Sequence, residues 1–167
     1  MCVFEQDGSV SFFFSLTAPG DCVCFGFQCR GVRNRDVSGS LPILVVEDEE
    51  ILLCFFKQAL ERGGFKVSAA SSGNEALALL EQKDFAGVVC DLRLEGGTGG
   101  PEIFEWVRKN RLQLSSCFLF ITGDASDPRA VELREHIGAP FIEKPFRVAQ
   151  LLEILKKLTS EKAGVFA

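Results

Sequence analysis

Acidic, hydroxyl and basic side chains directly follow four short apolar runs of this chain. The runs end at Glu47-Asp48, Asp91, Thr122 and Lys144. A short apolar run bounded by polar residues predicts a buried strand of a parallel sheet, and open sheets of this kind bind ligands at the carboxyl ends of their strands. Because the carboxyl ends of parallel strands lie at one edge of the sheet, we expect these five side chains to converge.

The converging groups suit phosphoryl transfer. Adjacent carboxylates such as Glu47 and Asp48 repel each other unless a cation binds, and hard oxygen ligands favour Mg²⁺ or Ca²⁺. A cation there would offset the charge of an incoming phosphoryl group, which Asp91 could attack as a nucleophile. Lys144 would then supply a fixed positive charge, and Thr122 a hydrogen bond, to phosphoryl oxygens. Each residue alone also fits a helix cap or a solvated charge, so the prediction depends on the whole set.

The chain from residue 41 onward alternates strand and helix signals five times. Apolar or, at 65–70, alternating segments predict strands at 43–46, 65–70, 87–91, 117–122 and 139–143. Capped or amphipathic stretches predict helices at 50–62, 72–82, 101–109, 128–138 and 148–159. Ser72 and Glu75 have the spacing of a capping box at the second helix. Right-handed crossovers then predict an α/β fold, a flavodoxin-like (βα)5 doubly wound parallel sheet with strand order 2-1-3-4-5.

The composition indicates one ordinary globular domain with an appendage. The chain has 167 residues, of which 47% are hydrophobic and 25% charged, and its net charge is −5. This negative charge does not favour nucleic-acid binding, and no apolar run is long enough to span a membrane. Three of the seven cysteines fall within apolar runs of the predicted domain, which is typical of a reducing compartment and predicts a cytoplasmic protein.

We divide the chain into three parts. Residues 1–40 form an irregular N-terminal extension, rich in Phe, Cys, Gly and Ser and without helical periodicity. A disordered segment and a misassigned start are both open interpretations of this extension. Residues 41–160 are the predicted domain, and residues 161–167 are a C-terminal tail.

Four motifs follow one another in this domain. They are Val45-Val46-Glu47-Asp48-Glu49, Val89-Cys90-Asp91-Leu92-Arg93, Ile121-Thr122-Gly123 and Glu143-Lys144-Pro145-Phe146. In order and spacing they resemble the receiver domain of response regulators, the CheY-like phosphoacceptor family of two-component signalling. Within that family the chain looks most similar to the C-terminal receivers of hybrid histidine kinases. A free single-domain regulator and a piece of such a kinase are therefore alternatives.

The resemblance implies a phosphoacceptor and a metal site. Asp91 would accept a phosphoryl group from a phosphohistidine on a histidine kinase or a histidine phosphotransfer protein. The carboxylates of Glu47, Asp48 and Asp91 would bind Mg²⁺ together with the backbone carbonyl of Arg93. A receiver of this kind assists its own phosphorylation and dephosphorylation, and we do not expect it to be an enzyme with a separate substrate.

The resemblance also implies switch residues. Lys144 would contact the phosphoryl group, and its bond to Pro145 is expected to be cis. Thr122 would be the switch hydroxyl, and Phe141 falls at the position of the switch aromatic. Because Phe141 has no ring hydroxyl, packing alone would set its position. A downstream protein partner would then recognise the changed face.

Two charged residues are expected to tune the lifetime of the acyl phosphate. Arg93 and Asp124 each lie two residues beyond a predicted site residue, which places them at the mouth of the pocket. There they could control the access of water to the phosphoryl group and could pair with each other.

Two other classes of protein remain as alternatives. A degenerate receiver would bind its partner without phosphorylation, and the four glycines in loop 94–100 favour it because they weaken preorganisation of the pocket. The second alternative is an enzyme, either a flavin or nucleotide binder or an aspartate-based phosphatase. The acids at 47–49 would repel a nucleotide phosphate, and Arg93 stands where such a phosphatase commonly has a second acid.

Overall fold

The computed structural model describes residues 3–4, 10–11, 40–124 and 126–160. By its internal contacts the chain divides into two units, residues 1–39 and 40–167. In the first unit, strands β1 (Val3–Phe4) and β2 (Val10–Ser11) pair in antiparallel fashion. The rest of the predicted N-terminal extension, and the predicted tail at 161–167, lie outside the described residues.

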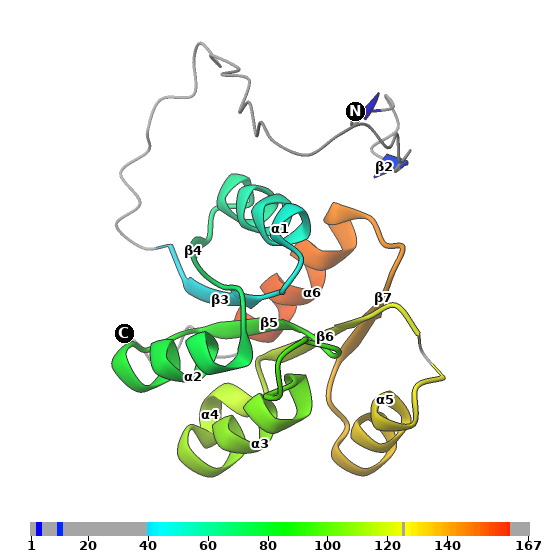
Figure 1. Ribbon diagram of the computed structural model, residues 1–167. Coiled ribbons are helices and arrows are strands. Elements are labelled where there is room, and N and C mark those ends of the chain that lie inside the picture. Colours follow the sequence, from blue (N-terminus) through cyan, green and yellow to red (C-terminus); the bar gives the residue numbers. More distant parts are fainter. Residues whose placement is uncertain (1–2, 5–9, 12–39, 125, 161–167) are drawn as a thin grey trace. The chain divides into compact units, whose positions relative to one another are not determined.

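Five parallel strands form the sheet of the second unit (Figure 1). They are β3 (Pro42–Val46), β4 (Lys66–Ala70), β5 (Gly87–Asp91), β6 (Phe118–Thr122) and β7 (Phe141–Glu143). Their order is β4-β3-β5-β6-β7, and every neighbouring pair is parallel, so the predicted flavodoxin-like fold with strand order 2-1-3-4-5 is confirmed. In register, Asp91 lies opposite Ile121 and Thr122 opposite Glu143, which brings the polar strand ends to one edge.

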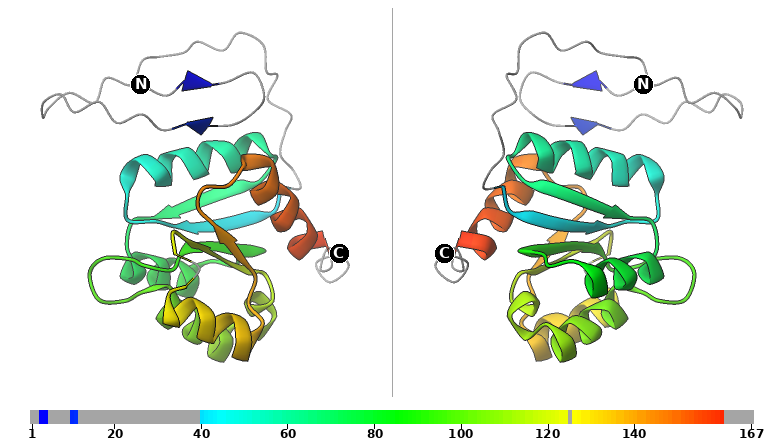
Figure 2. Two further views of the ribbon diagram at one scale, coloured as in Figure 1. Left: turned by 90° about the vertical axis from the view of Figure 1, so that its right-hand side faces the viewer. Right: turned by 90° about the vertical axis from the view of Figure 1, so that its left-hand side faces the viewer.

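Helices cover both faces of this sheet (Figures 1 and 2). Helices α1 (Glu50–Arg62) and α6 (Val148–Ser160) lie on one face. On the other are α2 (Gly73–Gln82), α3 (Gly100–Asn110), α4 (Leu112–Ser115) and α5 (Pro128–Glu132). The helix predicted over 128–138 is instead α5 followed by a π-helical turn, η1 (Leu133–Ile137). Within the described ranges, no helix is both long and apolar enough to cross a membrane.

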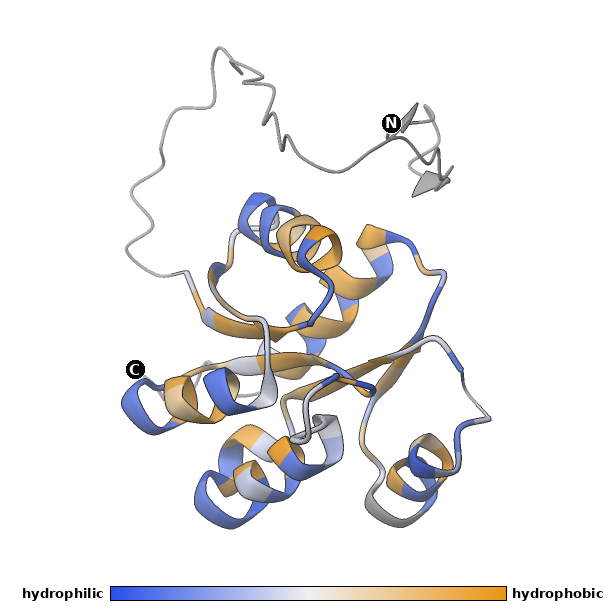
Figure 3. Cartoon of the chain, in the orientation of Figure 1, coloured by the Kyte–Doolittle hydropathy of each residue, from blue (hydrophilic) through white to orange (hydrophobic). Residues whose placement is uncertain are grey.

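The core consists of two apolar layers, one on each face of the sheet. The strands are the most hydrophobic elements (Figure 3), as expected for a sheet covered on both sides. On the α2–α3 face, the rings of Phe104 and Phe118 meet edge to face with their centroids 5.1 Å apart. Trp106 of α3 is half-buried and packs against the same layer. Each large side chain that is fully buried contributes about 1.5–3 kcal/mol to stability, and these layers fix the strand ends relative to each other.

The connections before α2 and after α3 differ in detail from the sequence prediction. Ser72 caps α2, because its Oγ accepts a hydrogen bond from the Glu75 backbone N–H at 3.3 Å. The Glu75 carboxylate returns to the N–H of Ser71 at 2.8 Å, so the reciprocal half of the capping box is displaced by one residue. The sequence does not predict α4. Arg111, which precedes it, donates to the Leu80 carbonyl at 3.2 Å and so ties this turn to the end of α2.

Candidate functional site

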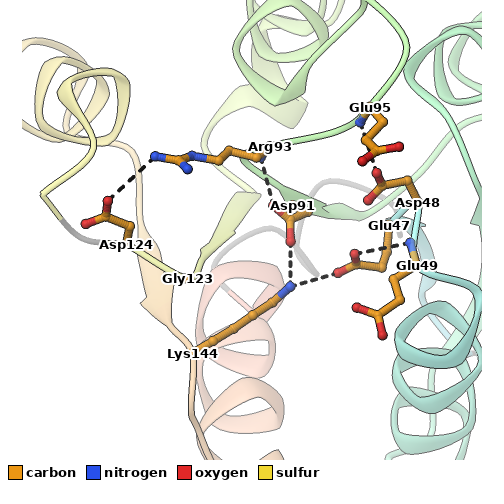
Figure 4. Close-up of a pocket in the computed structure, with 9 residues that line it drawn as sticks. All are labelled: Glu47, Asp48, Glu49, Asp91, Arg93, Glu95, Gly123, Asp124 and Lys144. Atoms are coloured by element: carbon orange, nitrogen blue, oxygen red, sulfur yellow. Dashed lines mark hydrogen bonds and ion pairs between the residues drawn. The ribbon is translucent and has the colours of Figure 1, made fainter. Parts of the chain in front are cut away.

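An acidic pocket of about 650 Å³ lies at the carboxyl edge of the sheet (Figure 4). Nine residues line it: Glu47, Asp48, Glu49, Asp91, Arg93, Glu95, Gly123, Asp124 and Lys144. Six of these carry a carboxylate and two carry a cation, which leaves four negative charges in excess when every acid is ionised. A pocket with this charge favours a bound cation and disfavours a bare anionic ligand.

Lys144 connects the two buried carboxylates of the pocket. Its Nζ donates to Asp91 Oδ2 at 2.5 Å and to Glu47 Oε2 at 3.0 Å. The other oxygen of Asp91, Oδ1, accepts a hydrogen bond from the Arg93 backbone N–H at 2.8 Å. The predicted cis bond between Lys144 and Pro145 is confirmed. Charge-assisted bonds to both oxygens fix the Asp91 carboxylate in one orientation.

Burial and neighbouring charge change the protonation of this cluster. Burial of Glu47, together with the nearby Asp91 carboxylate, raises the pKa of Glu47 to about 7, although Lys144 opposes the change. Burial alone would lower the pKa of Lys144, but its bonds to Asp91 and Glu47 raise that pKa above the ordinary value. The lysine therefore stays charged, and Glu47 carries an unfavourable negative charge above neutral pH.

The donor chemistry of the pocket fits the predicted Mg²⁺. The side-chain ligands expected from the sequence, Glu47, Asp48 and Asp91, all line the pocket, and carboxylate oxygens are the donors that Mg²⁺ prefers. In the part of the chain that the structure describes, no three acidic, His or Cys side chains are already grouped as a metal cluster. Lys144 lies between Glu47 and Asp91, and Asp48 Oδ2 accepts the Glu95 N–H at 3.0 Å. Magnesium binding stays a prediction.

Thr122 does not line the pocket. Its side chain is buried, and its Oγ1 accepts from the Asp124 N–H at 3.1 Å and donates to the Asp124 carbonyl at 3.0 Å. The expected convergence of polar strand ends is therefore found for the acids and Lys144. The hydroxyl of Thr122 is engaged within its own loop, because a short side chain at a strand end readily bonds to the backbone two residues on.

Arg93 has a second partner besides the predicted one. Its Nη2 lies 3.6 Å from Asp124 Oδ2, which confirms that these two residues pair. Its Nε donates to Asp127 Oδ2 at the shorter distance of 2.7 Å. Asp127 directly precedes Pro128 at the start of α5, a position that favours a helix-capping acid, and its Oδ1 accepts the Arg129 N–H at 2.9 Å. The bond from Arg93 and the cap bond together lower the pKa of Asp127.

Phe141 is half-buried beside an aromatic neighbour and a cation. Its ring stacks on Phe120, with centroids 4.9 Å apart and planes inclined by 19°. The guanidinium carbon of Arg134 lies 5.2 Å from the Phe141 centroid, within the range of a cation–π contact. No motif in the sequence points to Arg134. Phe120 and Arg134 thus supply the packing that was predicted to position the Phe141 ring in the absence of a hydroxyl.

Comparison with known proteins decides the family. The family model of the response regulator receiver domain matches residues 43–156. The chain belongs to the response regulator receiver family. This receiver is 32% identical over 132 residues to the sensor kinase CckA of Brucella abortus, covering 78% of this chain and 14% of that protein. It is 34% identical over 122 residues to the transcriptional regulatory protein ZraR of Salmonella typhimurium, covering 72% of this chain and 27% of that protein.

Solved structures of other receivers share the fold. A response regulator receiver protein from Sinorhizobium medicae is 30% identical, with a TM-score of 0.65 over 72% of this chain and 95% of that one. A CheY-like receiver domain from Methanospirillum hungatei is also 30% identical, with a TM-score of 0.68 over 75% of this chain and 98% of that one. The receiver thus matches nearly the whole of these two solved chains but only 14% and 27% of the two curated relatives. Origin in a hybrid kinase stays a prediction.

Proposed function

We propose that this receiver accepts a phosphoryl group on Asp91, in the cytoplasm, from a phosphohistidine of a histidine kinase or phosphotransfer protein. The observation that carries the proposal is the Asp91 carboxylate in an open pocket, with Oδ2 2.5 Å from the Lys144 ammonium. A carboxylate oxygen attacks phosphorus, and the phosphorus–nitrogen bond to the donor imidazole breaks. The electron pair stays on that nitrogen, and Asp91 becomes an acyl phosphate.

The residues around Asp91 would orient its carboxylate and stabilise the negative charge during this transfer. The Arg93 N–H holds Oδ1, which leaves Oδ2 to face the donor. Lys144 already contacts Oδ2 and can pass its hydrogen bond to a phosphoryl oxygen as the new bond forms. Bound Mg²⁺, held by Glu47, Asp48, Asp91 and the Arg93 carbonyl, would offset the negative charge that otherwise repels the donor. The same groups would later assist hydrolysis of the acyl phosphate.

Phosphorylation would then change the surface formed by β6, α5 and β7. The Thr122 hydroxyl, now bonded to Asp124, would turn to a phosphoryl oxygen and draw its loop toward the pocket. This movement would alter the contacts of Phe141, which packs on the same strand through Phe120. A two-state change of this kind gives a downstream protein partner a different face to bind.

Intact-mass measurement after incubation with acetyl phosphate and Mg²⁺ tests the proposal. We expect the wild type to gain one phosphoryl group, and Asp91→Asn, or the wild type with a chelator, to gain none. Asp84→Asn is a matched control, because Asp84 is an exposed acid that pairs with Arg111 and does not line the pocket. Absence of any gain in the wild type would refute the proposal and favour the degenerate receiver, which binds its partner without phosphorylation.

A further inference from the structure

We propose that Asp127 is a positioning residue that holds the Arg93 guanidinium away from Asp91 and thereby shortens the lifetime of the acyl phosphate. The inference builds on the proposed function, because it concerns the regulation of the same pocket. It assigns to Asp127 a role that its sequence position, at the start of α5, does not reveal.

The backbone of Arg93 is fixed next to the phosphoacceptor. Its N–H donates to Asp91 Oδ1 at 2.8 Å, so its side chain starts directly beside the group that would carry phosphate. That side chain is 64% exposed. Left to itself, a guanidinium at this position would pair with the nearest strong anion.

Of the two carboxylates that pair with Arg93, Asp127 makes the stronger interaction. The bond from Arg93 Nε to Asp127 is 0.9 Å shorter than the contact with Asp124, at 2.7 Å against 3.6 Å. The Asp127 side chain is 7% exposed, whereas that of Asp124 is 48% exposed and is screened by water. Asp124 is also occupied by Ser126, whose N–H and hydroxyl both donate to its Oδ1.

The position of Asp127 is itself fixed. Its Oδ1 accepts the Arg129 N–H at 2.9 Å, and its backbone carbonyl accepts the Val131 N–H at 3.0 Å. Because the cap uses Oδ1 and the arginine uses Oδ2, one carboxylate joins the loop after β5 to the start of α5. Arg93 is therefore directed toward the β6–α5 connection, as Figure 4 shows by its extension toward Asp124 and away from the Asp91 carboxylate.

After transfer, the negative charge of the phosphoryl group on Asp91 competes with Asp127 for the guanidinium of Arg93. A phosphoryl group adds negative charge and strong acceptor oxygens at the pocket, and these compete for the guanidinium of Arg93. As long as Asp127 retains Arg93, the phosphoryl group stays open to water on that side. Without the Asp127 charge, Arg93 can bond to phosphoryl oxygens and cover them, so hydrolysis becomes slower.

Asp127→Asn separates the two functions of this side chain. Asparagine keeps an oxygen that caps α5 and loses the charge that holds Arg93. Asp127→Ser is a second variant, because serine also caps helices but is too short to reach the guanidinium. Both variants should fold, and thermal unfolding followed by circular dichroism would check this.

The first measurement is hydrogen exchange of the Arg93 Nε–H by NMR on the unphosphorylated full chain. We expect slow exchange in the wild type and in Asp124→Asn, and fast exchange in Asp127→Asn and Asp127→Ser. Continued protection in both Asp127 variants would overturn the positioning role. This measurement needs no phosphorylation, so it decides that role even if the proposed function fails.

The second measurement is the decay of the phosphorylated protein, loaded with acetyl phosphate and Mg²⁺ and followed by intact mass. We expect Asp127→Asn to lengthen the lifetime about two- to fivefold, a modest factor because the Arg93 side chain is 64% exposed and water screens the ion pairs it makes. In an Arg93→Ala background the same substitution should have no effect, which a merely structural role of Asp127 would not produce. An unchanged or shorter lifetime, or an equal effect in both backgrounds, would overturn the regulatory role. A wild type that takes up no phosphoryl group counts against the proposed function instead.

Discussion

Glu47 should make the metal-free receiver less stable as pH rises. Its folded-state pKa is raised from 4.5 to about 7 by burial and by Asp91. Between these values the unfolded chain has released the proton, whereas the folded protein still holds it. The free energy of unfolding therefore falls with rising pH across this window, and the penalty is complete above the folded-state pKa. Glu47→Gln removes the titrating group and keeps an oxygen that can accept from Lys144.

The size of the effect follows from the two pKa values. One pKa unit corresponds to about 1.4 kcal/mol, so the rise from 4.5 to about 7 gives about 3 kcal/mol. The Glu47 side chain is 3% exposed, so water screens this penalty only weakly. Relaxation of Lys144 would reduce the effect, and about 3 kcal/mol is therefore an upper bound.

Urea unfolding followed by circular dichroism, in a chelator, measures this difference. We expect the unfolding free energy of Glu47→Gln minus that of the wild type to rise by about 1–3 kcal/mol between pH 4.5 and about pH 8. Taking the difference cancels the groups that titrate alike in both proteins. Glu49→Gln, an exposed acid of the same pocket, controls for the loss of one negative charge. A difference that does not change with pH would refute the reasoning.

Three further predictions concern packing, capping and thiol access. Gly73→Ala should lower the unfolding free energy by about 1–3 kcal/mol in urea titrations, because a Cβ there would lie 2.1 Å from a backbone oxygen of the loop before α3. Gly123→Ala, with nothing within 4 Å of its Cβ, is the control and should change it little. Ser72→Ala should lower the unfolding free energy by about 1 kcal/mol because α2 loses its cap, and an unchanged urea midpoint would contradict this. In mass-spectrometric mapping with an alkylating reagent, the exposed Cys54 should react in the folded protein and Cys90 only after unfolding. Cys90 is buried, and burial raises the pKa of its thiol. Equal labelling of both cysteines in the folded protein would contradict the prediction.

The sequence predicted the five strands and most of the helices because each of these elements carries its own signal, whereas the short helix α4 does not. Buried parallel strands are nearly continuous apolar runs, and the strand ends at Asp91 and Lys144 are recognisable where these runs stop. The region after Pro128 was predicted less well. The 3.6-residue pattern there does not distinguish an α-helix from the π-helical turn over 133–137, since both place apolar residues on one side.

The residues of the site were predicted better than their contacts, although the pairing of Arg93 with Asp124 was expected and is found. The motifs correctly place Glu47, Asp91 and Lys144 together, because sheet topology alone brings these strand ends to one edge. The direction in which a short or long side chain turns is not encoded in that topology. Thr122 therefore bonds to its own loop, and Arg93 pairs with Asp127, an acid 34 residues away at the start of α5.

The half-buried indole of α3 gives this protein a built-in optical reporter. Trp106 is the single tryptophan, and the chain has no tyrosine, so emission excited above the phenylalanine band comes from one ring. That ring packs on the apolar layer between α3 and the sheet, and it does not line the acidic pocket. Residues 1–40 contain neither chromophore and are silent in such a spectrum. A fluorescence-detected unfolding curve of the full chain therefore follows the receiver domain alone.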